Sequence, residues 1–315
     1  MIPEEAPEAL PGDAQDATLD AYLHQLATRR KLSKHTLAAY QSDLRQLANL
    51  CSAQPWSAVS HQEIRRHTSK LHAGGLSARS IARKLSAWRG FFDWLADHTK
   101  LAANPVAKIR APRRAKALPK ALSVDAAVQL VAAPSHGHSP ALDACNRAMF
   151  ELLYSSGLRV SELTSLDLAY SKVALGWVDF DSHEVIVTGK GNKMRKVPVG
   201  QPAIAALQAW LACRPAPVDG SAALFLSSRG SRMSPRVVQL RLKAHAQAVG
   251  IPANIHPHVL RHSFATHVLQ SSGDLRAVQE MLGHSSISST QVYTALDFQH
   301  LALVYDQTHP RAKIK

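Results

Sequence analysis

The chain has 315 residues, 46% of them hydrophobic, and is therefore long enough for two ordinary domains with buried cores. It carries 37 Lys and Arg residues against 23 Asp and Glu residues, a formal net charge of +14, and a chain this basic commonly binds nucleic acid. Three cysteines without a Cys-x-x-Cys pair exclude a zinc ribbon or a disulfide framework, and the sequence has neither a secretory signal nor an apolar run long enough to span a membrane. We therefore expect a cytoplasmic protein that binds nucleic acid.

The N-terminal third of the sequence predicts a helical domain preceded by a short tail. Residues 1–16 are acidic and rich in Pro and Ala, and we expect them to be disordered. Residues 17–104 have a helical pattern throughout, with Ser33 and the Ser60/Glu63 pair as expected helix N-caps.

The clearest helix of this domain lies in SARSIARKLSAWRGFFDWLADH, where apolar and basic residues separate onto two faces. The apolar stripe follows helical spacing and consists of Ile81, Leu85, Trp88, Phe92 and Leu95. Arg79 and Arg83 fall on the opposite face. We therefore expect these two arginines to contact DNA.

The stretch NPVAKIRAPRRAKALPKALS breaks the helical pattern, and we interpret residues 105–122 as a basic linker. Its prolines interrupt helices, and its basic residues meet no carboxylate: Lys108, Arg110, Arg113, Arg114, Lys116 and Lys120. Proline and like-charge repulsion both favour an extended segment. Such a linker can lie along a phosphate backbone, and we expect the first four of these basic residues to bind DNA. A merely solvated tether is the alternative.

Residues 123–315 predict a second domain of helices with a small β-sheet, so the fold class is mainly α. Ser123 is the expected N-cap of the first helix, and HEVIVTG and KVPV alternate like two strands that flank the turn KGNKMR. Helical patterns follow at 202–213, 234–248, 258–271 and 274–282. Gly283 is the expected C-cap of the last of these four helices. A short tail helix is expected at about 297–309.

The segment HPHVLRHSFATH places four histidines beside one arginine. His258 and His262 have the spacing of a zinc-binding pair, but no glutamate stands between them and Arg261 lies on the face of His258. A permanent cation disfavours a divalent metal, whereas arginine matches phosphate oxygens and histidine can transfer a proton near neutral pH. The segment therefore favours a phosphate site over a metal site.

Three other stretches carry residues that could act with this pair. SSGLRVSEL contains Arg159, VTGKGNKMRKVPV contains Lys190 in a hairpin turn, and MLGHSSISSTQVYTAL contains His284 and Tyr293. Each residue alone has an ordinary structural interpretation, such as a surface cap or a core aromatic.

Together and in this order, the stretches resemble the tyrosine recombinases of the phage integrase family, and within them the Xer group. The matching segments are SSGLRVSELTSLDL, TGKGNKMRKVPVG, HPHVLRHSFATHVLQSSGDLRAVQEMLGHSSISSTQVYTALDFQHL and HPRAK. The resemblance runs over essentially the whole chain after the acidic tail and is most specific from 256 to 300. It implies an N-terminal helical, SAM-like core-binding domain and a C-terminal α+β catalytic domain.

The resemblance also implies an active site composed of Arg159, Lys190, His258, Arg261, His284 and Tyr293. Tyr293 would attack a DNA phosphodiester and form a 3′-phosphotyrosyl link, while the two arginines hold the phosphate oxygens in place of a metal. We expect His258 to accept the tyrosine proton, His284 to donate a hydrogen bond to the phosphate and Lys190 to protonate the leaving 5′-oxygen. No cofactor is implied.

Some assignments remain open at this point. Lys193 and Lys196 are rivals to Lys190, because the segment between Arg159 and the hairpin is several residues longer than is usual in the family. Among the histidines of 256–267, we expect His262 and His267 to be structural, and His256 is undecided.

The implied function is site-specific recombination of double-stranded DNA that resolves chromosome and plasmid dimers at segregation. The implied partners are an XerD-like paralogue in a heterotetramer on DNA and an FtsK-like translocase, with no membrane association. The resemblance further implies that the tail stripe of Phe298, Leu301 and Tyr305 docks on a neighbouring protomer, docking on its own domain being the alternative. A type IB topoisomerase-like enzyme and a catalytically silent DNA-binding regulator are the alternative functions.

Overall fold

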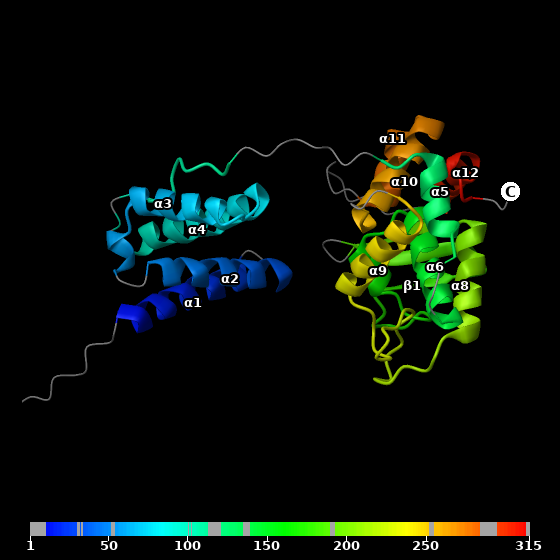
Figure 1. The fold of residues 1–315 in the computed structure, drawn as a ribbon, viewed down its shortest axis with the longest axis horizontal. Coiled ribbons are helices and arrows are strands. Elements are labelled where there is room, and N and C mark those ends of the chain that lie inside the picture. The colour runs from blue at the N-terminus through cyan, green and yellow to red at the C-terminus, as the bar shows by residue number, and fades with distance from the viewer. Residues whose placement is uncertain are drawn as a thin grey trace, which may run out of the picture. The chain divides into compact units, whose positions relative to one another are not determined.

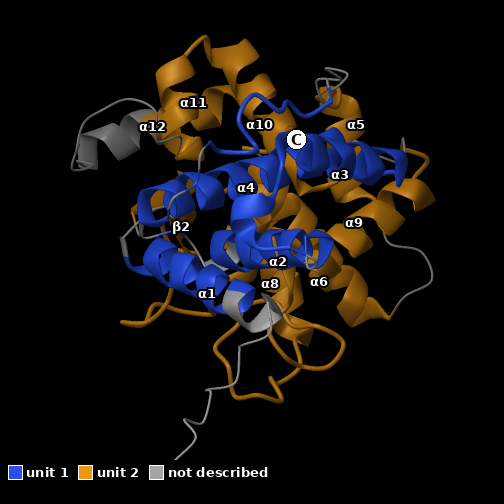
Figure 2. Ribbon diagram, turned by 90° about the vertical axis from the view of Figure 1, so that its left-hand side faces the viewer, with its two compact units in different colours: residues 1–117 blue, residues 118–315 orange. Residues whose placement is uncertain are grey.

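The computed structural model describes residues 11–29, 32, 34–51, 54–99, 101, 103–112, 121–134, 139–189, 193–251, 255–283 and 295–312. Within these ranges the fold is mainly helical with one small antiparallel sheet, as the sequence predicts (Figure 1). The chain divides into two compact units, residues 1–117 and 118–315, which are coloured separately in Figure 2.

Unit 1 is built from helices around an aromatic core. The helices are α1 (Pro11–Arg29), α2 (Lys34–Leu50), the short 3₁₀ helix η1 (Trp56–Ala58), α3 (His61–Ala73) and α4 (Ala78–His98). Trp88, Phe91 and Phe92 of α4 are completely buried, and the two phenylalanines meet Trp56 in edge-to-face contacts. The predicted apolar stripe of α4 is thus confirmed.

The caps of unit 1 are local sequence features with defined partners. The Ser60 side chain accepts a hydrogen bond from the Glu63 amide, and the Glu63 carboxylate accepts one from the Ser60 amide, which forms the predicted capping box of α3. The Ser77 side chain caps α4 by accepting a hydrogen bond from the Ser80 amide. The predicted cap Ser33 lies outside the described residues.

Two expected boundaries of unit 1 differ from the structure. Helix α1 begins at Pro11, so residues 11–16 are helical rather than disordered, and proline suits the first turn of a helix. The side-chain amide of Gln15 donates hydrogen bonds to the backbone carbonyls of Cys51 and Gln54. These bonds tie the first turns of α1 to the segment that follows α2. Those carbonyl partners could not be identified from the composition of the tail.

The segment expected to be an extended linker starts as part of the unit 1 core. Residues 105–108 form a turn in which Val106 is completely buried, and Ile109 is 8% exposed. His61 on α3 contacts the Pro105 carbonyl at 3.0 Å, and Arg89 on α4 donates to the Ile109 carbonyl at 3.0 Å. The extended-linker interpretation is therefore wrong for 105–109, where buried apolar side chains outweigh the basic composition.

Unit 2 is organised around the buried helix α6. Its helices are α5 (Val124–Ala132), α6 (Pro140–Ser155), α7 (Val160–Thr164), α8 (Gln201–Cys213), α9 (Pro235–Ala248), α10 (Pro257–Ser272), α11 (Leu275–Leu282) and α12 (Ala295–Thr308). Residues of α6 are buried in an unbroken run from Ala148 to Ser155, and α8 packs along this helix (Figure 1). Ser123 caps α5 as predicted.

The sheet of unit 2 has the antiparallel order β1 (Gly176–Asp179), β2 (Glu184–Thr188) and β3 (Met194–Pro198). The pairing of β2 with β3 confirms the predicted hairpin. Strand β1 and the short helix α7 are not among the predicted elements.

The tail helix α12 packs against its own unit. Leu301 and Tyr305 are 2% and 1% exposed, and α12 contacts α10, α11 and β3. The Tyr305 hydroxyl lies 2.6 Å from the Ser155 hydroxyl at the end of α6. The structure thus shows the alternative of docking in the same chain, whereas the expected docking was on a neighbouring protomer. The Phe298 side chain lies outside the described residues.

Candidate active site

Arg159 follows a tight turn at the end of α6. Gly157 has a φ of +56°, and a Cβ placed on it would lie 2.4 Å from the Phe264 ring of α10. Only glycine satisfies both the left-handed backbone and this close approach. The turn places Arg159 at the N-cap of α7, with its side chain 31% exposed.

Arg261 lies on α10 and is almost completely enclosed. Its guanidinium donates 2.6 Å hydrogen bonds to the Gly157 carbonyl and to the Leu282 carbonyl at the end of α11. Burial and the neighbouring charges of Arg159 and Arg195 lower the pKa of Arg261 to about 10, although Glu162 acts in the opposite direction. The group therefore remains a cation at neutral pH.

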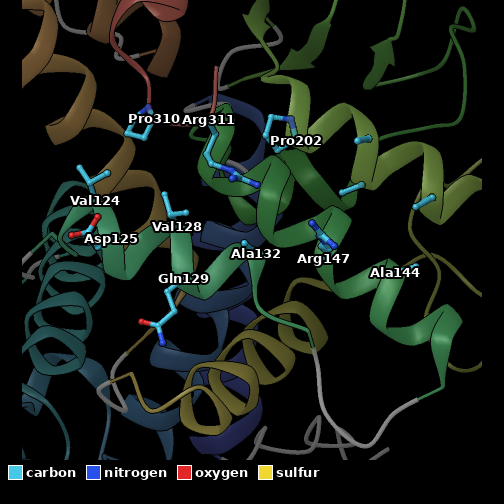
Figure 3. Close-up of a pocket in the computed structure, with 13 residues that line it drawn as sticks. Val124, Asp125, Val128, Gln129, Ala132, Ala144, Arg147, Pro202, Pro310 and Arg311 are labelled. Carbon is cyan, nitrogen blue, oxygen red and sulfur yellow. The ribbon is translucent and has the colours of Figure 1, made fainter. Parts of the chain in front are cut away.

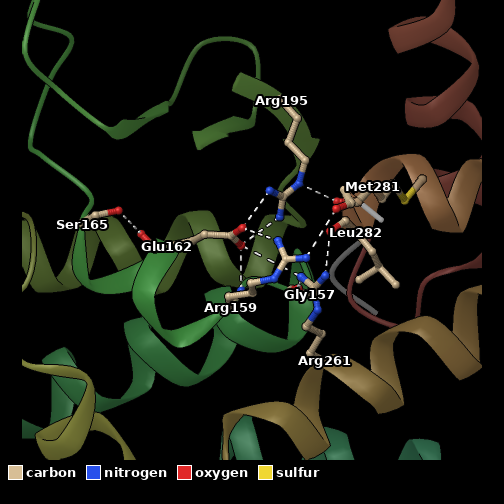
Figure 4. A network of polar contacts seen from close by, with 9 residues as sticks. Gly157, Arg159, Glu162, Ser165, Arg195, Arg261, Met281 and Leu282 are labelled. Carbon is tan, nitrogen blue, oxygen red and sulfur yellow. Dashed lines mark hydrogen bonds and ion pairs between the residues drawn. The ribbon is translucent and has the colours of Figure 1, made fainter. Parts of the chain in front are cut away.

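Glu162 is a buried carboxylate that joins these arginines (Figure 4). It accepts hydrogen bonds from the Arg159 amide at 2.8 Å and from the Arg159 guanidinium at 2.7 Å. Arg195 on β3 donates to both carboxylate oxygens at 2.8 Å, and Arg261 lies 4.0 Å away. Burial alone would raise the pKa of Glu162. The hydrogen bonds and charge of Arg195, together with the hydrogen bonds from Arg159, hold this pKa below its usual value.

The three arginines reach three successive carbonyls at the end of α11. Arg195 donates to Met281 at 2.9 Å and Arg261 to Leu282 at 2.6 Å, and Arg159 lies 3.4 Å from the Gly283 oxygen. These carbonyls have no partner within their own helix and form the negative end of its dipole. We refer to Arg159, Glu162, Arg195 and Arg261 as the arginine cluster.

Arg159 and Arg261, predicted from different stretches of the sequence, are thus brought together. Glu162 and Arg195 were not predicted. A signal for Arg195 exists in the strand MRKVP, where Arg195 and Val197 share the buried face while Met194 and Lys196 are exposed. An arginine at an inward position of a strand indicates a buried carboxylate partner.

Three predicted catalytic residues, Lys190, His284 and Tyr293, lie outside the described residues. Gly189 and Gly283, which directly precede Lys190 and His284, are described. The Gly189 amide donates to the Lys193 carbonyl at 2.8 Å, which closes the hairpin around Lys190. Gly283, the αL C-cap of α11, directly precedes His284. Both segments therefore depart from positions beside the arginine cluster.

The rival lysines differ in their surroundings. Lys196 points to the face of β3 opposite Arg195 and forms a 2.9 Å ion pair with Glu184. This orientation disfavours Lys196 as a member of the site. Lys193 is exposed at the start of β3.

The histidines of α10 separate into exposed and buried residues. His258 is exposed, and its ring lies 5.9 Å from that of His256. His267 is buried between the Tyr154 hydroxyl and the Leu122 carbonyl, each at 2.8 Å, so its predicted structural role is confirmed. His262 is exposed, so the prediction that it packs structurally is wrong.

The predicted DNA contacts of unit 1 are on its surface where they are described. Arg79, Lys108 and Arg110 are exposed. Arg83 is half exposed and forms a 2.9 Å ion pair with the buried Asp43 of α2. The other two predicted contacts, Arg113 and Arg114, lie outside the described residues.

Other features of the described ranges lie apart from this site. A hollow of about 770 Å³ is lined by α5, α6 and α8 with Pro310 and Arg311, and it shares no residue with the arginine cluster (Figure 3). No group of three His, Cys, Asp or Glu side chains in the described chain could hold a metal ion. None of the described helices is both long and apolar enough to cross a membrane.

Two family models cover most of the chain. Residues 120–300 match the phage integrase family, and residues 19–99 match the phage integrase N-terminal SAM-like domain. Tyrosine recombinase XerC 1 of Ralstonia nicotianae is 53% identical over 98% of this chain and 100% of its own length. The chain belongs to the phage integrase family.

More distant relatives agree with this membership. Tyrosine recombinase XerC of Pseudomonas aeruginosa is 45% identical over 95% of this chain and 96% of its own length. The fold resembles that of the XerH site-specific recombinase bound to a palindromic difH substrate, with a TM-score of 0.65 at 20% identity over 97% of this chain and 91% of that one. The chain is therefore a tyrosine recombinase, an enzyme that cuts and rejoins DNA in site-specific recombination, which disfavours the topoisomerase alternative.

Proposed function

We propose that Tyr293 is the nucleophile of this recombinase and that Arg159 and Arg261 bind the phosphate it attacks. The observation that supports this proposal is the arginine cluster, where two predicted arginines meet at the end of α11. The guanidinium group of each arginine donates two hydrogen bonds to described residues, out of five N–H donors, which leaves donors for phosphate oxygens.

In the proposed reaction the Tyr293 oxygen attacks phosphorus and the bond from phosphorus to the 5′-oxygen breaks. His258 takes the tyrosine proton, and Lys190 gives a proton to the departing 5′-oxygen. His284 donates a hydrogen bond to the phosphate, whose growing negative charge the two arginines stabilise. Attack by the 5′-hydroxyl of another strand reverses these steps, so the phosphotyrosyl link conserves the bond energy for religation.

At the cellular level, we propose that the enzyme resolves chromosome and plasmid dimers in the cytoplasm. It would act with an XerD-like paralogue in a heterotetramer on a recombination site, under control of an FtsK-like translocase. The identity to XerC proteins supports this assignment. The surplus of basic residues and the exposed Arg79, Lys108 and Arg110 support binding to the DNA backbone.

The test is covalent trapping on a nicked duplex. The duplex carries a site selected by the wild-type chain from a random library, and adducts are separated on a denaturing gel. We expect an adduct with the wild-type chain and none with Tyr293→Phe, which removes a nucleophile but no charge. Tyr170→Phe is the matched control, because Tyr170 is an exposed tyrosine outside the site and should still form the adduct. An adduct that survives Tyr293→Phe contradicts the proposal, and its absence in the wild type favours the silent regulator.

A further inference from the structure

Arg195 is the buried arginine of the cluster that the proposed reaction does not use. It is 6% exposed and extends from β3 toward the ends of α7 and α11 (Figure 4). Its two terminal nitrogens bind the two oxygens of Glu162, and its Nε binds the Met281 carbonyl. All three guanidinium nitrogens are therefore bonded within the protein, so Arg195 is placed to support the site.

The charges in the cluster show what Arg195 contributes. Three guanidinium groups surround one carboxylate, which leaves a surplus of two positive charges. Among the described side chains, only that of Arg195 bonds both oxygens of Glu162. The Arg159 guanidinium bonds one oxygen, its backbone amide bonds the other, and Arg261 stays 4.0 Å away. Bidentate, charge-assisted bonding to arginine is a strong pairing for a carboxylate.

Without Arg195, the described partners left to the Glu162 carboxylate would be Arg159 and Arg261. A buried carboxylate must be compensated, because an unpaired charge in a low-dielectric interior is costly. Both arginines would then turn their donors to the carboxylate and away from a bound phosphate. The surplus charge at the phosphate site would also be halved.

Arg195 additionally contacts the two segments that lead to the undescribed catalytic residues. A Cβ placed on Gly189 would lie 3.4 Å from an Arg195 terminal nitrogen, and one placed on Gly283 would lie 3.2 Å from its Cδ. Gly189 precedes Lys190, and Gly283 precedes His284. The Arg195 side chain thus lies against both of the residues that directly precede these predicted catalytic residues.

We infer that Arg195 is a positioning residue for strand cleavage: it holds the Glu162 carboxylate so that Arg159 and Arg261 remain available to the phosphate. This inference rests on the proposed function of those two arginines. It assigns Arg195 no contact with DNA and no proton transfer.

The test compares single-turnover adduct formation by Arg195→Met with that of the wild-type chain on the nicked, binding-selected duplex. We expect cleavage to slow by about 10²-fold, the size of effect seen when one charge-stabilising group is lost, while duplex affinity stays close to wild type. The second variant, Arg195→Met with Glu162→Gln, removes the carboxylate charge that Arg195 compensates. We expect it to cleave at least about tenfold faster than Arg195→Met, because a neutral amide no longer competes for the two arginines.

Arg232→Met is the matched control for the loss of a structural arginine. Arg232 pairs with Asp167 and donates to the carbonyls of Thr164 and Leu166 in the same unit, but it lies outside the cluster. This variant should cleave like the wild type once it is folded. Its cleavage rate therefore separates a specific role of Arg195 from general destabilisation.

Near-normal cleavage by Arg195→Met, or a double variant no faster than Arg195→Met, overturns the inference. If Arg195→Met does not fold, the same comparison uses Arg195→Gln, which also removes the charge, and a Glu162→Gln change that fails to accelerate it is equally decisive. A wild-type chain that makes no Tyr293-dependent adduct contradicts the proposed function instead.

Discussion

Arg261 donates a 2.6 Å hydrogen bond to the Leu282 carbonyl, so a buried cation of α10 holds the last turn of α11. The segment that begins two residues later carries His284 and Tyr293. The Arg261 guanidinium thus links the proposed phosphate site to the end of α11, which precedes the segment with the proposed nucleophile.

Replacement of either proposed phosphate-binding arginine should slow cleavage. We expect Arg159→Ala and Arg261→Ala each to reduce the single-turnover cleavage rate by about 10²-fold or more, because each removes a charge-assisted contact to the phosphate. Arg276→Ala on α11 is the control, since Arg276 is 70% exposed and pairs with Glu280 one turn away. Wild-type rates in both cluster variants would remove these arginines from the reaction.

Strand cleavage should not require a divalent metal. Arginines supply the positive charge in the proposed reaction, so cleavage in excess EDTA should match that in magnesium. The measurement is adduct yield against time with each additive, at constant ionic strength because duplex binding depends on salt. A strict requirement for magnesium or zinc would reverse our interpretation of residues 256–267.

Deletion of residues 305–315 should destabilise unit 2. Arg311 forms an ion pair with Glu151, which is completely buried, and removal of one partner of a buried pair costs about 3–5 kcal/mol. Urea denaturation of the full-length and shortened chains measures this loss. The wild-type free energy of unfolding should not change with protein concentration, because the partners belong to one chain. Stabilisation that grows with concentration would instead indicate docking on a neighbouring chain.

Stability should decline as the pH falls below about 6.5, the ordinary pKa of histidine. Burial, together with His267 and Arg311, lowers the pKa of His309 to about 3, so the folded chain leaves this ring neutral. The unfolded chain takes up the proton below its ordinary pKa, and the stability present above that pH is lost progressively down to about pH 3.

His309→Phe isolates this effect, because it keeps an aromatic ring next to Tyr305 and cannot titrate. Between pH 7.5 and 5.5, the wild type should lose about 1.4 kcal/mol more unfolding free energy than the variant. Denaturant titrations at several pH values give the two slopes. Parallel slopes would mean that His309 titrates normally in the folded chain.

The sequence predicts the helices and the hairpin well where periodicity and caps are strong. The stripe of α4 and the Ser60/Glu63 capping box are examples, because their partners are close in sequence. The course of residues 105–109 was not predictable in this way. Val106 and Ile109 are buried by helices that the local sequence does not specify, so charge and proline content suggested an extended segment.

The candidate site was predictable only in part, for a related reason. Arg159 and Arg261 stand in motifs that carry the family resemblance. Glu162 and Arg195 owe their roles to each other across 33 residues, and neither has a local signal beyond an inward-facing arginine in a strand. Long-range pairs of this kind become visible only when the fold brings them together.

The cluster binds main-chain oxygens at Met281, Leu282 and Gly283, which any amino acid supplies. Substitutions at the first two positions can therefore accumulate during evolution without altering the polar contacts of the site. An insertion or deletion would alter these contacts. One added or removed residue in α11 turns the helix by about 100° and moves every one of these oxygens. We expect homologues to vary here in residue type and to keep the length of α11 constant.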